Sequence, residues 1–382
     1  MTYELLLSTV QGASHIKHDI PCEDSGLINN GETRKIFITA DGHGDSNCPR
    51  SRFGADTICR VAAEKLDSFV GSIADEQWTQ QLFEPKRAEQ LIRQLIRSIV
   101  AAWTKAVNED YEERPLTEAE RAGCSKYIER YDRGERIEHI YGTTLLAGVL
   151  TEEYLLLLHQ GDGHLVLFDS QGAVSEPVAW DDRCFANVCT SMCDTDVISS
   201  MRYQVVDLRE APIAACLLGS DGIDDSFFSS EQMYAYYREL LVYAAQNGVE
   251  ALQAHLDEML PELSRTGSGD DITISAVIQP ELIVTLTERF ERDSQIDTAK
   301  SQVTAIRDRL ASMEGGKLDF LKKRWETAAQ EVQRSKKTAE DAEDAAEKAQ
   351  KEYEEYLARY NELKEALAVE EEKLSALQAS EA

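Results

Sequence analysis

One stretch constrains the fold of this chain more than any other: the apolar run Ile36–Ala40, which stops at Asp41. Its β-branched and aromatic residues predict a short buried strand. Gly42 and Gly44 then flank His43, and glycine lets a backbone turn sharply and approach a ligand closely. A carboxylate and an imidazole are thus displayed at a strand end, which suits a cation and a proton donor. A hairpin turn with a solvated histidine is the alternative, because Asp-Gly is common in hairpins.

Four further acidic motifs adjoin apolar segments elsewhere in the chain. They are Glu23-Asp24, Gly161-Asp162-Gly163, Asp221-Gly222 with Asp225, and Asp270-Asp271. Each one alone is most simply a turn, but five of them beside strands favour one shared site. Carboxylate oxygens suit Mg²⁺ or Mn²⁺, and two such ions would activate a water and clamp a phosphoryl group. Histidines are few and are not paired at ligand spacing, so zinc is not expected.

Strand and helix patterns fill the rest of the first 280 residues. Helical spacing of apolar residues covers 51–70, 85–107, 230–246 and 249–260, and strands at 143–151, 154–160 and 164–168 form an antiparallel meander. Residues 108–138 are highly charged and are predicted to be a surface insertion. The segment 175–212 is irregular and contains three cysteines, Cys184, Cys189 and Cys193.

A different pattern begins near residue 281. Apolar residues recur at alternating spacings of three and four from 296 to 313, and again from 321 to 377. This heptad stripe predicts a coiled coil. Gly315-Gly316 separates the two parts, so we expect a helical hairpin that turns there and has a longer second helix. The same pattern fits pairing within one chain and pairing with a second chain.

Composition excludes several partners and compartments. The formal net charge of −30 argues against nucleic acids and anionic membranes, since both attract basic surfaces. The chain starts without the basic and apolar segments of a signal peptide, and no stretch approaches the ~20 apolar residues of a membrane span. The eight cysteines form no Cys-x-x-Cys pair. They are expected to be reduced thiols in a cytoplasmic protein.

The order of the motifs resembles that of the type 2C metal-dependent Ser/Thr protein phosphatases, and bacterial members most closely. The resemblance rests on Cys22-Glu23-Asp24, Asp41-Gly42-His43-Gly44, Gly142-Thr143-Thr144, Gly161-Asp162, Ser220-Asp221-Gly222-x-x-Asp225 and Gly267-Ser268-Gly269-Asp270-Asp271-x-Thr273. It implies an α+β fold, a four-layer α-β-β-α sandwich of two antiparallel sheets flanked by helices. The expected domains are a phosphatase domain over residues 1–280 and a helical coiled-coil arm over residues 281–382.

The resemblance also implies a role for each acidic motif. Asp41 would bridge two metal ions, and the Gly42 carbonyl would bind one of them. Asp221 and Asp270 would hold the second ion. Glu23 and Asp24 would act near the ions, largely through bound waters. Asp162 and Asp225 would help to bind a third, weaker cation.

Proton transfer and phosphate binding involve other residues. His43 matches the imidazole that protonates the leaving alkoxide in the family, a role that needs a pKa near neutrality. The family usually carries a phosphate-binding arginine where this chain has Asp19. His15, Lys17 or His18 would have to replace it, and His15 and Lys17 are the candidates we retain. Asp271 stands where the family often has asparagine, and segment 175–212 stands where the family has a variable flap.

The function that these observations predict is hydrolysis of phosphoserine and phosphothreonine on proteins by a two-metal centre of Mg²⁺ or Mn²⁺. The expected partners are a phosphoprotein substrate, a cognate Ser/Thr kinase, and a coiled-coil partner or a second copy of the chain. Two alternatives stay open. The protein could be a catalytically weak, phosphatase-like sensor that signals through its coiled coil, or the arm itself could be an assembly device to which catalysis is incidental.

Overall fold

The computed structural model of the protein describes residues 2–73, 76–185, 188–334 and 339–379. It divides into two compact units, which are described separately below. The first unit comprises Met1–Met233 and Tyr237–Phe290, and the second comprises Tyr234–Tyr236 and Glu291–Ala382. Among the described residues, no helix is both long enough and apolar enough to cross a membrane.

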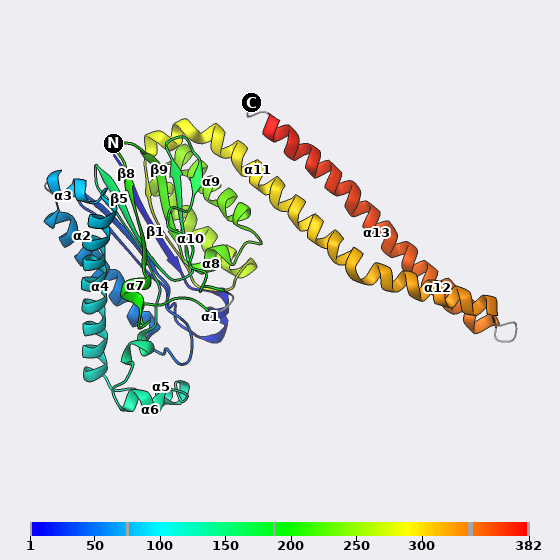
Figure 1. Cartoon of the computed structure of the whole chain (residues 1–382), viewed down its shortest axis with the longest axis horizontal. Coiled ribbons are helices and arrows are strands. Elements are labelled where there is room, and N and C mark those ends of the chain that lie inside the picture. The colour runs from blue at the N-terminus through cyan, green and yellow to red at the C-terminus, as the bar shows by residue number, and fades with distance from the viewer. Residues whose placement is uncertain (1, 74–75, 186–187, 335–338, 380–382) are drawn as a thin grey trace. The chain divides into compact units, whose positions relative to one another are not determined.

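Two five-stranded antiparallel sheets form the centre of the first unit (Figure 1). The first sheet has the order β1 (Glu4–Val10), β10 (Ile272–Ile278), β9 (Ile213–Gly219), β6 (His164–Asp169) and β7 (Val174–Ser175). The second has the order β2 (Ser25–Asn30), β3 (Lys35–Ala40), β4 (Leu145–Leu150), β5 (Tyr154–Gln160) and β8 (Arg202–Asp207). The runs of leucine, isoleucine and valine in β5, β9 and β10 are fully buried, as expected of strands covered on both faces.

The two sheets pack face to face through an apolar layer. Phe37 on β3 lies in this layer with Leu157 of β5 in the same sheet and with Leu218 of β9 and Val277 of β10 in the other sheet. Gly148 on β4 makes room for the Phe37 ring, since a Cβ atom there would lie 2.3 Å from the ring. Side chains from both sheets thus interdigitate at the density of a protein core.

Helices cover both outer faces of the sandwich. α2 (Ser51–Ser72) and α4 (Pro85–Glu113) bury their apolar faces against the second sheet, and α10 (Val249–Thr266) packs on β1 (Figure 1). The rings of Tyr243 and His255 stack at 4.2 Å and join α9 (Ser230–Asn247) to α10. The described part of the unit also contains short helices outside residues 108–141: α1 (Ala13–His18), α3 (Glu76–Gln81), α7 (Val197–Ser200) and α8 (Asp221–Asp224). The predicted α-β-β-α sandwich is confirmed.

Residues 108–138 differ from the prediction of a surface insertion. They include part of α4, then α5 (Glu118–Gly123), α6 (Ile128–Asp132) and the start of the 3-10 helix η1 (Ile137–Tyr141). The side chains of Cys124 and Tyr131 are 0% and 1% exposed and belong to the core beneath α2 and α4. The high charge of the segment led to the prediction of a surface insertion, but its few apolar residues pack into the core of the domain.

The second unit is helical. Its elements are the end of α11 (Pro280–Ser312), the π-helical turn η2 (Met313–Lys317), α12 (Leu318–Arg334) and α13 (Ala339–Ala379). α12 and α13 pack antiparallel: the rings of Trp325 and Tyr353 stack at 5.8 Å, and Lys317 lies over the Tyr356 ring.

The predicted turn at Gly315-Gly316 is wrong, because the backbone stays helical through Met313–Lys317. α12 ends at Arg334 and the antiparallel α13 begins at Ala339, and residues 335–338 lie outside the described residues. Helical packing can tolerate a glycine pair, so the pair does not by itself mark a turn. The stripe positions 332, 339 and 342 also lie outside the described side chains.

Candidate metal centre

Three carboxylates from separate strand ends meet at one edge of the sandwich. Asp41 follows β3 and Asp162 follows β5 in one sheet, whereas Asp221 follows β9 in the other. One carboxylate oxygen from each lies within 4.8 Å of the other two. The acidic turns that are 59 to 180 residues apart in sequence therefore form one cluster, as expected of ligands that share cations.

The electrostatics of this cluster are unfavourable without a cation. Burial raises the pKa of Asp41 well above its usual value, and the neighbouring Asp221 and Asp24 carboxylates raise it further. Burial also raises the pKa of Asp221, again with contributions from nearby carboxylates, chiefly Asp162. Burial raises the pKa of Asp162 as well. Buried like charges disfavour ionisation, and a divalent cation among them would reverse that effect.

The Asp41 backbone is held by the Gly142-Thr143-Thr144 motif. The Asp41 carbonyl accepts hydrogen bonds from Thr143 Oγ1 and from the Thr144 amide, both at 2.8 Å, and the Asp41 amide donates to Thr144 Oγ1 at 2.9 Å. Gly42 lies so close to the Glu23 carbonyl that a Cβ atom there would be 2.7 Å from it. The glycine after Asp41 is therefore required by a close approach of two backbones.

Glu23 and Asp24 lie beside the cluster on the loop before β2. Asp24 is buried and accepts a hydrogen bond from Ser220 Oγ at 2.8 Å. Burial raises the pKa of Asp24 to about 7, and the neighbouring Asp271 and Asp270 carboxylates add to the shift. The Glu23 carboxylate accepts a hydrogen bond from Ser51 Oγ at the start of α2. Both predicted residues are thus present at this edge, with protein hydroxyls as their partners.

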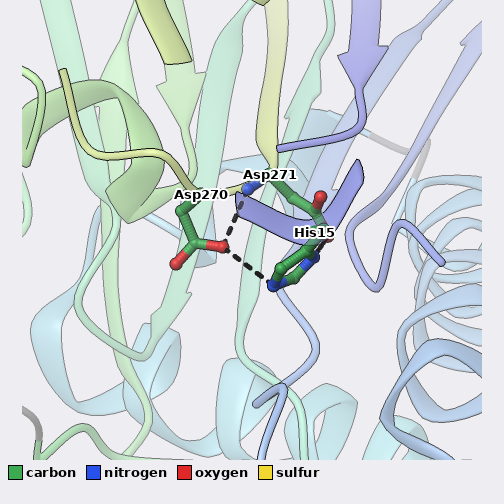
Figure 2. A group of neighbouring side chains, drawn as sticks. All are labelled: His15, Asp270 and Asp271. Atoms are coloured by element: carbon green, nitrogen blue, oxygen red, sulfur yellow. Dashed lines mark hydrogen bonds and ion pairs between the residues drawn. The ribbon is translucent and has the colours of Figure 1, made fainter. Parts of the chain in front are cut away.

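Asp270 belongs to a second cluster, with His15 and Asp271 (Figure 2). His15 Nε2 lies 3.6 Å from Asp270 Oδ1, and His15 Nδ1 lies 3.0 Å from Asp271 Oδ2. The Asp270 charge also raises the pKa values of Asp41 and Asp221, so the two clusters adjoin. The sequence singled out Asp270 and His15 but treated Asp271 only as a conservative replacement.

His43 contacts the segment that corresponds to the flap. Its Nε2 atom lies 2.7 Å from Ser191 Oγ, and its Nδ1 atom lies 3.7 Å from Cys189 Sγ, within hydrogen-bonding reach of sulfur. Burial lowers the pKa of His43 to about 4. The imidazole is therefore neutral at pH 7 in this structure. No pattern in the sequence indicated that segment 175–212 would reach the ring.

Lys17 and Asp225 lie at the margins of the site. Lys17 is exposed on α1, two residues after His15, and Asp19 ends this helix in a left-handed conformation. Asp225 is exposed directly after α8, where its amide donates to the Asp221 carbonyl at 2.9 Å. Asp225 thus lies one helical turn from the central cluster, whereas Asp162, which was expected to share a third cation with it, lies within the cluster.

His164 is a charged residue near the site that the sequence did not single out. Its Nδ1 lies 3.1 Å from Glu176 and its Nε2 lies 3.4 Å from Asp224, while Trp180 stacks on the ring at 5.1 Å. Burial alone would lower the pKa of His164, but Asp224 and Glu176 outweigh it and raise the pKa to about 10. A histidine after a Gly-Asp-Gly turn carries no recognisable signal of such pairing.

The paired His164 predicts a pH-dependent contribution to stability. Because the folded pKa of about 10 exceeds the unfolded value of ~6.5, the contribution is complete below pH ~6.5 and disappears as the pH rises through about 10. We expect His164→Gln to lower the melting temperature by about 5 °C at pH 6 and by much less at pH 10.5. His18→Gln on exposed α1 is the control. A deficit of the same size at both pH values would contradict the ion pairing.

Comparison with known proteins identifies the family. The family model described as Protein phosphatase 2C matches residues 11–261. That is well over half of the chain, so the chain belongs to the protein phosphatase 2C family, and the resemblance inferred from the motifs is confirmed. Its class is that of the protein serine/threonine phosphatases. No curated protein matches the chain.

Several solved structures resemble this one at low sequence identity. A bacterial serine phosphatase is 17% identical and has a TM-score of 0.45, with 72% of this chain and 98% of that chain covered. The serine/threonine phosphatase Stp1 from Staphylococcus aureus is 16% identical with a TM-score of 0.46, covering 73% and 96%. The Mycobacterium tuberculosis phosphatase PstP/Ppp is 16% identical with a TM-score of 0.41, covering 73% and 99%.

Proposed function

We propose that this protein hydrolyses phosphoserine and phosphothreonine on proteins, with a dinuclear Mg²⁺ or Mn²⁺ centre. One observation carries the proposal: the carboxylates of Asp41, Asp162 and Asp221 lie within 4.8 Å of one another and are partly buried, and none of the three residues is cationic. Burial and mutual repulsion raise their pKa values. Such a set fits hard divalent cations, which prefer carboxylate oxygens.

The residues that would hold the cations follow from this cluster. Asp41 and Asp221 come from different sheets and would bind both ions, with the Gly42 carbonyl, Asp270 and the adjoining Glu23 and Asp24 completing the set. Asp162 would join the central pair, because its carboxylate lies with theirs, and Asp225 would contribute to a weaker third ion. When bound, such ions lower the pKa of water and neutralise charge on a phosphoryl group.

The side chains around the cluster would handle the proton and the phosphate. A proton donor at neutral pH needs a pKa near 7, whereas burial lowers the pKa of His43 to about 4. His43 can therefore act as the acid when a nearby negative charge, such as the phosphate of the substrate, raises its pKa. His15 and Lys17 on α1 would supply hydrogen-bond donors for that phosphate, and Lys17 would also supply positive charge.

The complete set of acidic residues favours an enzyme over a phosphatase-like sensor. We assign the phosphatase domain to residues 1–280, with a cytoplasmic phosphoprotein as substrate and a cognate Ser/Thr kinase as the source of the phosphate. Residues 281–382 would form a coiled-coil arm for assembly or targeting. The stacking of Trp325 on Tyr353 supports pairing of α12 with α13 within one chain. A monomeric mass of the full chain in solution is expected, and a stable dimer that is lost with α13 would contradict it.

Assays on a panel of phosphopeptides test the proposed function. Purified protein should release phosphate from phosphoserine and phosphothreonine peptides and from p-nitrophenyl phosphate in Mn²⁺ or Mg²⁺. Excess EDTA should stop the reaction, and added Mn²⁺ should restore it. A folded protein that releases no phosphate from any substrate in either metal would overturn the proposal and favour the sensor.

A further inference from the structure

Asp271 is a buried carboxylate with several partners. It is 3% exposed. Its Oδ1 accepts a hydrogen bond from the Gly12 amide at 2.6 Å, and its Oδ2 accepts one from the Glu23 amide at 2.6 Å. The same Oδ2 atom lies 3.0 Å from Nδ1 of His15 (Figure 2). One side chain therefore ties together two loops and an imidazole at the edge of the metal centre.

The loop that carries His15 is fixed independently of the ring. The Ala13 amide donates to Ser264 Oγ at 2.9 Å, and the Ser14 amide and hydroxyl both donate to the Gly269 carbonyl, at 2.8 and 2.7 Å. A Cβ atom on Gly12 would lie 2.4 Å from the Asp270 carbonyl carbon, so the backbones are in contact. The position of the His15 backbone therefore does not depend on Asp271 alone, and the ring contacts both Asp271 and Asp270.

The two ring nitrogens of His15 have different surroundings. Nδ1 lies 3.0 Å from Asp271 Oδ2, a carboxylate oxygen that can only accept a hydrogen bond from a protonated ring nitrogen. This contact lacks hydrogen-bond geometry in the structure, and Nδ1 is buried. Nε2 lies 3.6 Å from Asp270 Oδ1, which belongs to the candidate metal ligands. Asp270 is exposed, so the Nε2 side of the ring adjoins an exposed carboxylate.

We propose that Asp271 is a positioning residue: it clamps His15 through Nδ1 so that Nε2 is presented beside Asp270 to the phosphate of the substrate. This inference rests on the proposed function for the identity of its ligand. It assigns control over phosphate affinity to a buried carboxylate that acts through His15. Such clamping is the general way in which a second partner fixes the tautomer and orientation of an imidazole.

Binding of inorganic phosphate tests the inference without turnover. The affinity is measured by calorimetry in Mg²⁺ for the wild type, His15→Gln, Asp271→Asn and the double variant. We expect both single variants to bind phosphate about tenfold more weakly, consistent with loss of one charge-assisted contact, and the double variant to bind no more weakly than Asp271→Asn. Ser14→Ala, which removes one hydrogen bond from the same loop, is the matched control and should stay within about twofold of the wild type.

Two further measurements separate positioning from folding. His15→Arg keeps a hydrogen-bond donor for the phosphate and should recover phosphate affinity to within about threefold of the wild type. Long-range ¹H–¹⁵N correlation spectra of the wild type should show a protonated Nδ1 on His15, a result that needs no Asp271 variant to fold. In phosphopeptide hydrolysis, His15→Gln and Asp271→Asn should raise KM more than they lower kcat.

Several outcomes would overturn the inference. They are an unprotonated Nδ1, wild-type phosphate affinity in a folded Asp271→Asn variant, and effects of the two substitutions that multiply in the double variant. The proposed function fails separately. If the wild type hydrolyses no phosphopeptide but its phosphate affinity falls as expected in both variants, the positioning role stands and the phosphatase activity does not.

Discussion

Replacement of Asp41 or Asp221 by asparagine is expected to lower phosphatase turnover about 10³-fold or more. Each substitution removes one charged oxygen ligand from the three-carboxylate cluster. Cations in such a centre supply several kcal/mol of transition-state stabilisation, and a loss of ~4 kcal/mol corresponds to about a thousandfold in rate. The measurement is the initial rate on a phosphothreonine peptide in saturating Mn²⁺, with Asp56→Asn on the exposed face of α2 as the control.

Asp41→Asn and Asp221→Asn should lower turnover without lowering the melting temperature. Because Asp41 and Asp221 are held near other carboxylates, which raise their pKa values, neutralising either one relieves repulsion. Each variant should melt at or above the temperature of the wild type in EDTA. Mn²⁺ should raise the melting temperature of the wild type, since a ligand bound only to the folded state stabilises it, and should raise that of the variants much less. Near-normal activity in both variants would refute the assignment of the centre.

The second large effect concerns Arg50, which joins the charged segment after α4 to the domain. Its guanidinium is 10% exposed and donates to Asp110 at 3.1 Å, to Glu120 at 2.8 Å and to the Tyr141 hydroxyl at 3.1 Å. Arg50→Ala leaves the buried Asp110 carboxylate without this partner. We expect a loss of about 3 kcal/mol in the free energy of unfolding, the lower end of the range for breaking a buried pair, because Arg114 also contacts Asp110.

Urea denaturation measures this loss, and the chain offers a matched control. Arg34 pairs with Asp67 at 2.6 Å, but both side chains are partly exposed, at 26% and 42%. Arg34→Ala should therefore cost less than about 1 kcal/mol. Equal losses in the two variants would contradict the view that Arg50 holds a buried network. The loss of Arg50 should also weaken Mn²⁺ binding, since Tyr141 precedes the motif that holds the Asp41 backbone.

The sequence predicted the acidic motifs and the sandwich because both depend on local patterns. Strand ends are visible where apolar runs stop, and Asp41, Asp162 and Asp221 all follow such runs. The sequence pattern does not give the distances between residues that lie on different sheets. Asp162, the third carboxylate in the central cluster, was therefore expected to help Asp225 to bind a third, weaker cation, and the contact between Asp270 and His15 was not foreseen.

Other features depended on contacts that no local pattern encodes. The buried role of Asp271 arises from the amides of Gly12 and Glu23, about 250 residues away in sequence. The contact between His43 and the Cys189–Ser191 stretch comes from an irregular segment without periodicity. The heptad stripe predicted helices correctly but did not locate the boundary between α12 and α13, because the same apolar spacing continues in both helices.

Anomalous diffraction from crystals grown with Mn²⁺ tests directly whether Asp41 and Asp221 hold the metal ions. We expect Mn²⁺ peaks bonded to carboxylate oxygens of Asp41 and Asp221, and their loss in crystals of Asp41→Asn. Mn²⁺ bound solely between His15, Asp270 and Asp271, or absent from an active enzyme, would contradict this assignment.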